Sequence, residues 1–575
     1  MNNAPLLIAF ILLGMGFLIP NHFPPWLSWQ NEIVVFAAIL LMAATVVCKD
    51  WRQRCGYLRI PVLALVPLGL TLLALVQWAV GLMVYGGEVL VVLSYALLCS
   101  MCVTIGYAQA SESTRKANAI IRAPAANALA WTLLFAAALT AYILLLQNFL
   151  LESPALSWAA SSNIRNYARP GGYLSQANHA ATLQLLGMVS LLFLHARDRL
   201  SAPSSAAFLL LLGIGMAVTQ SRTSVLSLGV LLLWWAWKRP QLTPRIPLWV
   251  GVFISVLIVL LFWSWRHLFN AVHMMGRDGA QVRGLSDVRS QIWQQLSQAA
   301  WQKPWLGWGI NQTATAHSAI ADGYPPTAAF TYSHNVVLDM ALWVGLPITA
   351  ILVLLTAVWL WRRARAVQSP LAWYGLALAL PVAVHSMLEF PFTYAYFLAP
   401  FMLGLGFTEG VVGGRSLRLN GKLATAILLI SGATLAYSAI EYARVEEDFR
   451  MARFEDLRLG QTPATYAVPE TMLLTQLGAQ LKAFRLEAKP NMRLVDLRLL
   501  HAVAAQSANA TISARYALAL ALNGQRSQAE RQLIVIRAQY GEKNHQAACL
   551  SIQAALNADK INWQPDCSLK EPTAK

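Results

Sequence analysis

Long runs of apolar residues, separated by short polar and basic segments, occupy most of this chain. About thirteen of these runs have the roughly 17–25 residues that a helix needs to cross the hydrocarbon core of a bilayer. The pattern predicts an all-α integral membrane protein with about thirteen transmembrane helices. These runs lie near residues 4–20, 33–48, 61–81, 89–108, 126–150, 179–196, 205–219, 223–238, 247–265, 334–361, 371–388, 394–412 and 423–440.

The lysines and arginines gather in alternate connecting segments. When the runs are numbered with the N-terminus inside, the inside loops carry 18 of these residues, and the short outside loops carry three, Arg165, Arg169 and Arg222. Because Lys and Arg are enriched in cytoplasmic loops, this bias predicts a cytoplasmic N-terminus. The long 266–333 loop, Arg222 and the tail after Tyr442 are then expected on the periplasmic or exterior side.

The last part of the chain differs from the rest in being polar, alanine-rich and helical in its periodicity. The stretches Ala514–Gly524 and Ala529–Leu533 are typical of a helix–turn–helix tetratricopeptide (TPR) unit, and only one or two such units fit. We therefore expect a small helical domain at the C-terminus. The predicted organisation is an N-terminal transmembrane bundle at 1–265, a periplasmic loop at 266–333, C-terminal transmembrane helices at 334–442 and a soluble TPR-like domain at 443–575.

Composition agrees with a membrane protein. Of the 575 residues, 57% are hydrophobic and 12% charged, and the mean hydropathy is +0.50, whereas soluble domains carry about 25% charged residues. The net charge of +17 does not indicate nucleic-acid binding, because the basic residues lie in short clusters between apolar runs. Six cysteines are too few for a disulfide framework, but Cys549 and Cys567 would lie in an oxidising compartment, and we hypothesise a disulfide between them.

The most informative stretch runs from Arg289 to Gly345 and contains Lys303-Pro-Trp-Leu-Gly-Trp-Gly309 and Thr331-Tyr-Ser-His-Asn335. A helix that starts here with Ser333 as its N-cap would point free backbone N–H groups toward water. Such a helix end suits a phosphate, with an imidazole beside it. The alternative is that His334 is an interfacial histidine that only satisfies the helix end.

A second polar segment precedes the run near 179–196. It reads Arg169-Pro-Gly-Gly-Tyr173 and then Gln176-Ala-Asn-His179. The glycines allow either a tight turn or a close approach of a ligand to the backbone. Arg169, Gln176, Asn178 and His179 supply donors and acceptors suited to sugar hydroxyls or phosphate, and polar residues at a membrane entrance often serve function.

Two further features lie on the same predicted side. Arg222, in Gln220-Ser-Arg-Thr-Ser224, is a single cation between two apolar segments; we favour an anion ligand over a snorkelling arginine. His385 and Glu389 are spaced i, i+4, which would place them on one helix face near the outer boundary. They either pair with each other or orient another group, such as His334 or an acceptor.

In order and membrane side, these features resemble the O-antigen ligase/polymerase (Wzy/WaaL-like) superfamily. Within it the chain looks most like bacterial protein O-oligosaccharyltransferases of the PglL type. The resemblance covers nearly the whole chain and rests on an ordered set of segments. These are His22-Phe-Pro-Pro-Trp26, Gly172-Tyr-Leu-Ser-Gln-Ala-Asn-His179, Arg222, Arg289 with Trp293, Pro304-Trp-Leu-Gly-Trp-Gly309, Ser333-His-Asn335, His385-Ser-Met-Leu-Glu389, Tyr394-Ala-Tyr396 and the helical tail.

The resemblance implies a glycosyltransferase of the bacterial inner membrane. It would transfer a preassembled oligosaccharide from undecaprenyl pyrophosphate to Ser or Thr hydroxyls of a pilin or another exported protein, with membrane lipid around the donor. It also implies that His334 is the catalytic histidine and that Arg222 contacts the pyrophosphate. Gln176 would lie near the active site, and either Tyr394 or Tyr396 would be the functional tyrosine.

The residues give this chemistry a physical account. Pyrophosphate is a good leaving group, so the enzyme mainly has to neutralise the charge that develops on it, which Arg222, Arg289 and Arg169 could do without a metal. No exterior Asp-x-Asp pair or dense carboxylate cluster indicates a divalent-metal site, and no cofactor is expected. His334 would act as general base on the acceptor hydroxyl, with Asn335 beside it in the substrate site.

Three other functions remain open from the sequence. O-antigen ligation or Wzy-type polymerisation would use the same lipid donor with a different acceptor. A polytopic transporter or flippase would be expected to carry ionisable residues near the middle of the bilayer and internal repeats, neither of which is apparent. A membrane-anchored scaffold for the tail would leave the ordered arginine, Trp-Gly and Ser-His-Asn segments unexplained.

Overall fold

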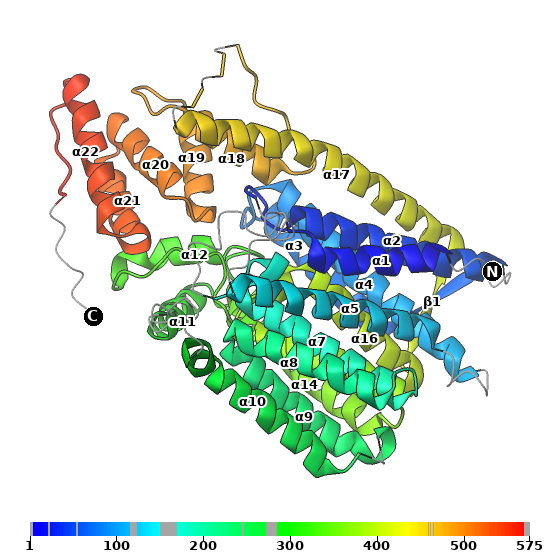
Figure 1. Ribbon diagram of the computed structural model, residues 1–575. Helices are drawn as coiled ribbons and strands as arrows, with labels where there is room; N and C mark the ends of the chain where they lie inside the picture. The colour runs from blue at the N-terminus through cyan, green and yellow to red at the C-terminus, as the bar shows by residue number, and fades with distance from the viewer. Residues whose placement is uncertain are drawn as a thin grey trace. The chain divides into compact units, whose positions relative to one another are not determined.

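The computed structural model is almost entirely helical, with a single pair of short strands in the part of the chain that it describes (Figure 1). The described residues are 4–20, 23–52, 56–115, 123–149, 169–243, 246–271, 285–457, 459–460, 462–463 and 465–567. His22 and Arg165 lie outside these ranges, so the expectations that involve them are not addressed by the structure.

The chain forms two compact units, each assembled from three separate stretches. Unit 1 comprises residues 1–70, 93–283 and 356–437, and unit 2 comprises 71–92, 284–355 and 438–575. Because each unit is discontinuous, the units do not follow the four consecutive ranges that the sequence suggests. Each unit is described separately below.

The helices agree closely with the apolar runs. In chain order, they begin with α1 (Ala4–Leu18), α2 (Trp29–Arg52), α3 (Val66–Ala79), α4 (Gly86–Arg115), α5 (Pro124–Asn148), α7 (Ala177–Ala196), α8 (Ala202–Thr219), α9 (Arg222–Leu242) and α10 (Leu248–Ala271). They continue with α11 (Leu285–Gln302), α12 (Thr313–Ile320), α13 (Val336–Val344), α14 (Leu346–Ala366), α15 (Pro370–Ser386), α16 (Ala395–Val412), α17 (Gly421–Asp456), α18 (Thr475–Arg485), α19 (Leu494–Gln506), α20 (Ala510–Leu522), α21 (Arg526–Tyr540) and α22 (Glu542–Ala558).

Ten helices in the described part of the chain are long and apolar enough to cross a membrane, against about thirteen expected. Two expected spans form the shorter apolar helices α1 and α15, and the run at 223–238 forms α9, which is not among the ten. This establishes a multi-pass membrane protein of the all-α class.

One expected span is not continuous. The run at 334–361 is divided at Gly345 into α13, of nine residues, and α14. Gly345 has φ +86°, and a Cβ at this position would clash with the carbonyl oxygens of Pro304 and Trp305. The close approach of another backbone segment therefore breaks the helix, and the candidate span begins only at Leu346.

In unit 1, α7 is buried along nearly its whole length and packs against α5, α8 and α15. α15 packs in turn on α16, where Gly375 and Gly404 let the two backbones meet. Small residues at such contacts are common between membrane helices because they allow close packing. This arrangement fixes the N-terminal end of α7 against the segment that joins α15 to α16.

The only sheet in the described residues is also in unit 1. Strand β1 (Tyr57–Pro61) pairs with β2 (Ser416–Asn420) in antiparallel register, with Arg59 opposite Arg418. Both strands come from loops that the charge pattern puts on the same side of the membrane. Their pairing is therefore consistent with the alternation of loops inferred from the lysines and arginines.

In unit 2, α19 to α22 form successive antiparallel helix pairs around a shared apolar core (Figure 1). Leu500, Ile512, Leu520, Leu533 and Ile552 are buried in this core. α20 and α21 form the helix–turn–helix expected at this position; their assignment to a TPR-like fold stays a prediction. The hypothesised disulfide is present, with the Cα atoms of Cys549 and Cys567 6.1 Å apart.

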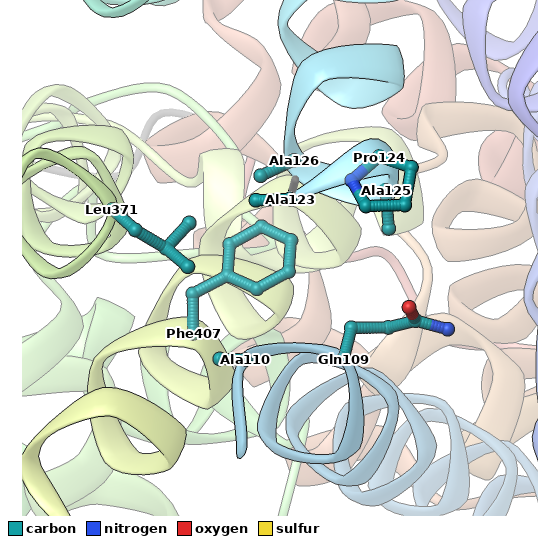
Figure 2. Close-up of a pocket in the computed structure, with 8 residues that line it drawn as sticks. All are labelled: Gln109, Ala110, Ala123, Pro124, Ala125, Ala126, Leu371 and Phe407. Carbon is teal, nitrogen blue, oxygen red and sulfur yellow. The ribbon is translucent and has the colours of Figure 1, made fainter. Parts of the chain in front are cut away.

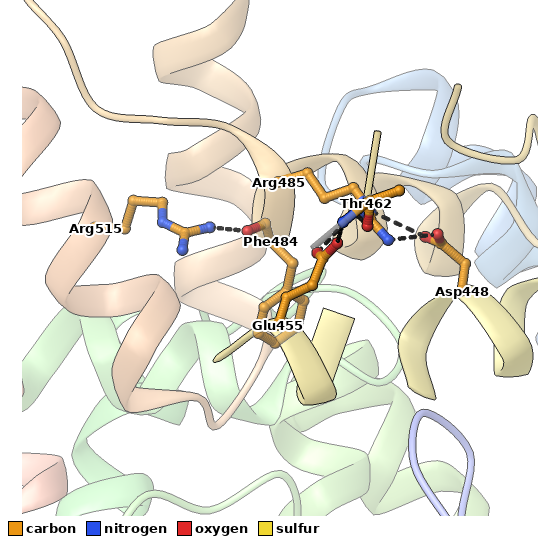
Figure 3. Close-up of polar contacts among 6 residues, drawn as sticks. All are labelled: Asp448, Glu455, Thr462, Phe484, Arg485 and Arg515. Carbon is orange, nitrogen blue, oxygen red and sulfur yellow. Dashed lines mark hydrogen bonds and ion pairs between the residues drawn. The ribbon is translucent and has the colours of Figure 1, made fainter. Parts of the chain in front are cut away.

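An arginine cluster ties α18 to the end of α17 within unit 2 (Figure 3). Arg485 contacts Asp448 Oδ1 at 2.7 Å and Glu455 Oε2 at 3.0 Å, and it donates to Thr462 Oγ1 at 3.2 Å. Asp448 is 0% exposed in its side chain. A buried, multiply bonded ion pair of this kind fixes one geometry, so we assign the cluster a structural role.

Candidate active site

The expected site residues of unit 1 meet at the N-terminal end of α7. Asn178 lies at the centre: its Oδ1 accepts from Ser221 Oγ at 2.8 Å and from Arg169 Nη2 at 3.4 Å. Its Nδ2 donates to Glu389 Oε1 at 3.0 Å. We call Arg169, Asn178, Ser221 and Glu389 the Asn178 cluster. Three stretches far apart in the sequence therefore share one buried amide.

Hydrogen bonds from α5 hold the loop that carries Arg169. Gln147, itself buried, accepts from the backbone N–H of Gly172 at 2.9 Å and donates to its carbonyl oxygen at 3.4 Å. Gly172 has φ +62°, a left-handed conformation that favours glycine. The glycines therefore serve a tight turn. Gln147 was not identified from the sequence, where it is a single polar residue in an apolar run.

Arg222 is the first residue of α9, and it directly follows Gln220 and Ser221, which the Asn178 cluster holds by hydrogen bonds. Arg169 Nη1 donates to the carbonyl oxygen of Gln220 at 2.9 Å, and Ser221 contacts Asn178. The Arg222 side chain is exposed. Two arginines are thus next to one turn. Arg169 is hydrogen-bonded to the turn, and the Arg222 side chain is exposed.

An aromatic cage surrounds His179. Its ring centroid lies 4.7 Å from that of Tyr394 and 5.3 Å from that of Phe397, both in edge-to-face geometry. His179 Nδ1 is 3.4 Å from the hydroxyl of Tyr396. Tyr396 is fully buried, whereas Tyr394 is partly exposed. Of the two tyrosines, Tyr394 is therefore the one that a substrate could reach.

His385 and Glu389 each contact a side chain of α7. His385 Nδ1 lies 2.8 Å from Thr182 Oγ1, and Glu389 bonds Asn178, so each contacts its own partner on α7. α15 ends at Ser386, which places Glu389 beyond the helix rather than on its face as expected. Its backbone N–H still donates to the His385 carbonyl at 2.9 Å, and this last turn keeps the i, i+4 spacing.

Two other residues complete this end of unit 1. Gln176 directly precedes α7 and is partly exposed, and its side chain does not cap the helix. Glu32, which the sequence did not single out as a site residue, accepts from Tyr95 Oη at 2.9 Å and from the backbone N–H of Ala395 at 2.7 Å. Ala395 is the first residue of α16, so Glu32 fixes the helix end between Tyr394 and Tyr396.

In unit 2, Ser333, His334 and Asn335 form a tight turn before α13; we call it the His334 turn. The N-cap is Asn335 and not Ser333: Asn335 Oδ1 accepts from the N–H groups of Val337 at 3.0 Å and Leu338 at 3.2 Å. The expectation that Ser333 is the N-cap is therefore wrong, and the Asn335 side chain occupies two of the helix N–H groups at which a phosphate site was expected. Asn335 serves the fold through this cap.

His334 has φ +59°, which is uncommon for a residue with a side chain. Such backbone strain persists only where surrounding contacts hold it, and it is frequent at active sites. The ring lies 5.6 Å from that of Phe330, edge to face, and the residue is neither fully buried nor fully exposed.

Asp339 is one of the contacts that hold the His334 turn, and the sequence reasoning missed it. It is fully buried, and its Oδ1 accepts from the Ser333 backbone N–H at 2.8 Å and from Thr313 Oγ1 at 2.9 Å. Burial raises the pKa of this carboxyl to about 6, against which its hydrogen bonds and the charge of His334 act. A lone acid in an apolar run was the signal that could have identified it.

Trp293 braces the turn from α11. Its indole Nε1 donates to the Ser333 carbonyl oxygen at 2.8 Å. Arg289 lies one helical turn earlier on α11 and is partly exposed. Because residues four apart share a helix face, Arg289 projects from the same side of α11 as Trp293. The contact of Trp293 with Ser333 therefore joins α11 to the His334 turn.

The Pro-Trp-Leu-Gly-Trp-Gly segment supports the other end of α13. Trp308 donates through its backbone to Leu342, and Leu346 donates to Pro304 at 2.7 Å. Gln77, fully buried, donates to the carbonyl oxygens of Leu306 at 3.0 Å and Trp343 at 2.7 Å. This segment is structural: it fixes the helix that carries the His334 turn.

No group of three or more His, Cys, Asp or Glu side chains in the described ranges is placed to hold a metal ion. A small pocket in unit 1 is lined by apolar side chains and one amide, that of Gln109 (Figure 2). The other residues of this pocket are Ala110, Ala123, Pro124, Ala125, Ala126, Leu371 and Phe407. With no charged or nucleophilic group in its lining, this pocket is not a candidate active site.

Two protein-family models match the chain. Residues 206–353 match the family described as O-antigen ligase, and residues 373–555 match that of the C-terminal part of virulence factor membrane-bound polymerases. Two curated proteins of Acinetobacter baylyi are similar over most of their length. One is a general O-oligosaccharyltransferase, 26% identical over 549 residues, which are 92% of this chain and 91% of the relative. The other is a ComP-specific O-oligosaccharyltransferase, 24% identical over 72% of each chain.

Over most of its length the chain is therefore similar to the O-antigen ligase/polymerase superfamily. The ligase match contains Arg222, Arg289 and the His334 turn, so it includes the turn at the start of α9 as well as the loop of unit 2. The polymerase match contains His385, Glu389 and most of the C-terminal helical domain. The superfamily resemblance noted in the sequence is therefore confirmed, and both curated relatives belong to the oligosaccharyltransferase branch that its segments indicated.

Proposed function

We propose that this protein is an O-oligosaccharyltransferase that moves a preassembled oligosaccharide from undecaprenyl pyrophosphate to Ser or Thr hydroxyls of exported proteins such as a pilin. The observation that carries the proposal is the similarity over nine-tenths of the chain to a general O-oligosaccharyltransferase. The proposed location is the bacterial inner membrane, with the N-terminus in the cytoplasm and the reaction on the periplasmic face. The lysine and arginine distribution supports this orientation.

In this proposal the arginines receive the donor pyrophosphate. Arg169 is anchored to Gln220 and Asn178, and the exposed Arg222 begins α9 two residues after Gln220. Arg289 of unit 2 is a third candidate. Guanidinium groups form short, charge-assisted and often bidentate hydrogen bonds with phosphate oxygens. They stabilise the negative charge that builds up as the sugar–phosphate bond breaks.

His334 is the proposed general base. The acceptor oxygen forms a bond to the anomeric carbon while the bond from that carbon to the pyrophosphate oxygen breaks, and its electron pair leaves with the pyrophosphate. The hydroxyl proton passes to a ring nitrogen of His334. A positioned base of this kind contributes about 10²- to 10⁴-fold to the rate. The strained φ of His334 supports a role that depends on a fixed ring direction.

The remaining site residues are proposed to position the substrate. Gln176 and Tyr394 are partly exposed and can contact sugar or acceptor groups. Asn178, His179, His385, Glu389 and Tyr396 are buried and hold the reachable residues in place. This division follows from exposure, because a fully buried side chain cannot touch a bound oligosaccharide without a rearrangement.

An in vitro transfer assay tests the proposal. The purified protein in detergent receives undecaprenyl-pyrophosphate oligosaccharide and an exported acceptor protein, with and without EDTA. We expect protein-linked glycan under both conditions, its loss in H334A and R222A, and wild-type transfer by R493A, which removes a cation exposed on the C-terminal domain. Protein-linked glycan that forms only when a divalent ion is present would contradict metal-free catalysis. Transfer by H334A at the wild-type rate would contradict the assignment of His334 as general base.

The second candidate function is O-antigen ligation or polymerisation, which the match of residues 206–353 to the O-antigen ligase family favours. It uses the same donor but a lipid-linked saccharide as acceptor. The same assay separates the two functions when a lipid-linked saccharide is added: glycan on lipid, or a lengthened polymer, with unmodified protein would select this candidate.

A further inference from the structure

The first inference concerns Asp339, a buried carboxylate that the proposed reaction does not otherwise use. Oδ1 of Asp339 fixes the backbone of Ser333 and is itself fixed by Thr313. Thr313 Oγ1 also accepts from the Trp343 indole N–H at 2.8 Å, so the carboxylate is oriented by a chain of hydrogen bonds. Oδ2 is buried and has no hydrogen-bond partner. A buried charged oxygen without a donor is costly unless another contact compensates for it.

Asp339 is linked to His334 through the backbone of the preceding residue. Asp339 accepts a hydrogen bond from the backbone of Ser333, the residue directly before His334, and the N-cap Asn335 directly follows His334. A carboxylate in a low-dielectric interior favours a nearby imidazolium. The cost of keeping Asp339 buried is therefore offset at the moment when His334 holds the acceptor proton.

We propose that Asp339 is a positioning residue for His334: it holds the His334 turn in its left-handed conformation, and its negative charge stabilises the protonated ring. This role rests on the proposed function of His334. The geometry resembles the general arrangement in which a buried acid orients a catalytic histidine and stabilises its imidazolium. Here the acid acts through the backbone of the preceding residue as well as through its charge.

The test separates charge from shape. D339N keeps an oxygen at the Oδ1 position for Ser333 and Thr313 and removes only the charge, whereas D339L removes both. We expect D339N to reduce kcat about 10- to 100-fold with less than about threefold change in KM for donor and acceptor, and with undiminished thermal stability. We expect D339E to recover part of the activity, and D339L to lose activity and stability together.

The matched control is D448N, which neutralises another buried carboxylate of unit 2, in the Arg485 cluster. It should lower thermal stability while the folded protein keeps its kcat. A wild-type kcat for D339N would overturn the inference, and so would an equal loss of kcat in D448N. Absence of transfer by the wild-type protein would instead overturn the proposed function, so the two failures are distinguishable.

A second inference rests on separate contacts, between α21 and the segment that leads to the His334 turn. The backbone N–H groups of Thr327 and Ala329 donate to the carbonyl oxygens of Ala538 at 2.9 Å and Gln539 at 3.0 Å. The Gln539 side chain donates to Ser318 Oγ at 3.1 Å. The C-terminal helical domain therefore supplies backbone hydrogen-bond partners to a loop that lies outside any helix or strand.

Arg531 adds a third attachment on the same helix. Its guanidinium donates to the Ala319 carbonyl oxygen at 3.0 Å and lies 3.3 Å from Asp322 Oδ2. The attached loop ends four residues after Ala329 at Ser333. We infer that α21 positions the segment that leads to the His334 turn, so that the C-terminal domain is part of the catalytic architecture and not only a module that recruits acceptors.

Kinetics of the full-length protein test this inference. The double variant R531A/Q539A should lower kcat about tenfold, both for transfer and for the acceptor-free hydrolysis of the undecaprenyl-linked donor, because the loop is less well fixed. The control R493A, on α19's N-terminal side, removes a salt bridge confined to the domain and should leave both rates unchanged. A purely recruiting domain would instead raise KM for the acceptor and spare hydrolysis, and that result would overturn the inference.

Discussion

Asn178 on α7 donates through its side-chain amide to Glu389 Oε1 across 3.0 Å, and this contact joins α7 to the segment between α15 and α16. The carbonyl oxygen of the same amide accepts from Ser221 and Arg169, which are donors, so the orientation of the amide is fixed by its neighbours. The Asn178 side chain therefore hydrogen-bonds to three segments of unit 1 and fixes the position of the turn that precedes Arg222.

The first prediction follows from this contact. N178A leaves Arg169, Ser221 and Glu389 without a shared partner, and we expect a loss of about 1–3 kcal/mol of stability and a kcat reduced about 10- to 100-fold. The measurements are thermal unfolding in detergent and steady-state transfer. S190A, on the same helix, removes one buried hydrogen bond to Tyr374 and should affect stability alone. Equal activity loss in S190A would show that the cluster has no special role.

The second prediction separates the two arginines of that turn. Arg222 is exposed, so R222A should leave unfolding unchanged while kcat/KM for the lipid donor falls about 100-fold or more, the loss expected for a charged hydrogen bond to a developing phosphate charge. R169A should lower both activity and stability, because Arg169 also bonds Gln220 and Asn178.

Lysine substitutions sharpen this comparison. R222K keeps a point charge and should recover part of the activity, whereas R169K cannot reproduce two separate guanidinium contacts and should behave much like R169A. R59A removes another exposed arginine of unit 1, on β1, and serves as the control that should keep full activity. A kcat/KM for the donor that is the same in R222A and in the wild type would contradict a pyrophosphate role.

The sequence predicted most helices because apolar runs of this length have few other structures available in a membrane. It also singled out Arg169, Asn178 and Glu389 of the Asn178 cluster, but not Ser221, since polar groups at the ends of apolar runs stand out. It could not find Gln77, Gln147 or Glu32 as supports, because single polar residues carry no periodic signal. What identifies them is the backbone group that each one satisfies.

The N-cap of α13 shows a limit of local reasoning. Ser333 and Asn335 are both good N-cap residues, and the sequence between them offers no preference. The choice is made by tertiary contacts, because Asp339 and Trp293 engage the backbone of Ser333 and leave Asn335 to cap the helix. The break at Gly345 is likewise set by a distant segment, that of Pro304 and Trp305.

The third prediction uses that break. G345A would place a methyl group against the carbonyl oxygens of Pro304 and Trp305 at a residue with φ +86°. We expect the strain and the clash together to cost on the order of 3 kcal/mol or more, and to abolish transfer, because the orientation of α13 depends on this junction. G229A, at a position with open space in α9, is the control and should be neutral or slightly stabilising. A G345A protein that unfolds at the wild-type temperature would contradict this account.

The fourth prediction concerns pH. Burial raises the pKa of Asp339 to about 6, and its hydrogen bonds with Ser333 and Thr313 oppose the shift. Because the native pKa lies above the ordinary value of 3.8, the folded state binds the extra proton between about pH 4 and 6. This group therefore makes the protein more stable as pH falls through 6, while activity that needs the anion declines.

The comparison of wild type with D339N over pH 4–8 checks this sign. The difference in unfolding temperature, D339N minus wild type, should be largest above pH 6 and shrink below it, since wild-type Asp339 is then neutral as well. The pH at which kcat declines on the acidic side of its pH profile should also change in D339N. A difference in unfolding temperature that does not vary with pH would mean that Asp339 does not titrate in this range.

The last prediction decides between the two tyrosines that follow His385 and Glu389. Tyr394 is partly exposed with its ring 4.7 Å from that of His179, whereas Tyr396 is fully buried with its hydroxyl 3.4 Å from His179 Nδ1. Y394F should therefore lower kcat/KM about tenfold without changing the unfolding temperature, because it removes a hydroxyl that substrate can reach. Y396F should cost about 1 kcal/mol of stability and leave the folded enzyme with most of its activity. The reverse pattern, an inactive but stable Y396F and an active Y394F, would show that the buried hydroxyl acts through His179 and that His179 takes part in the reaction.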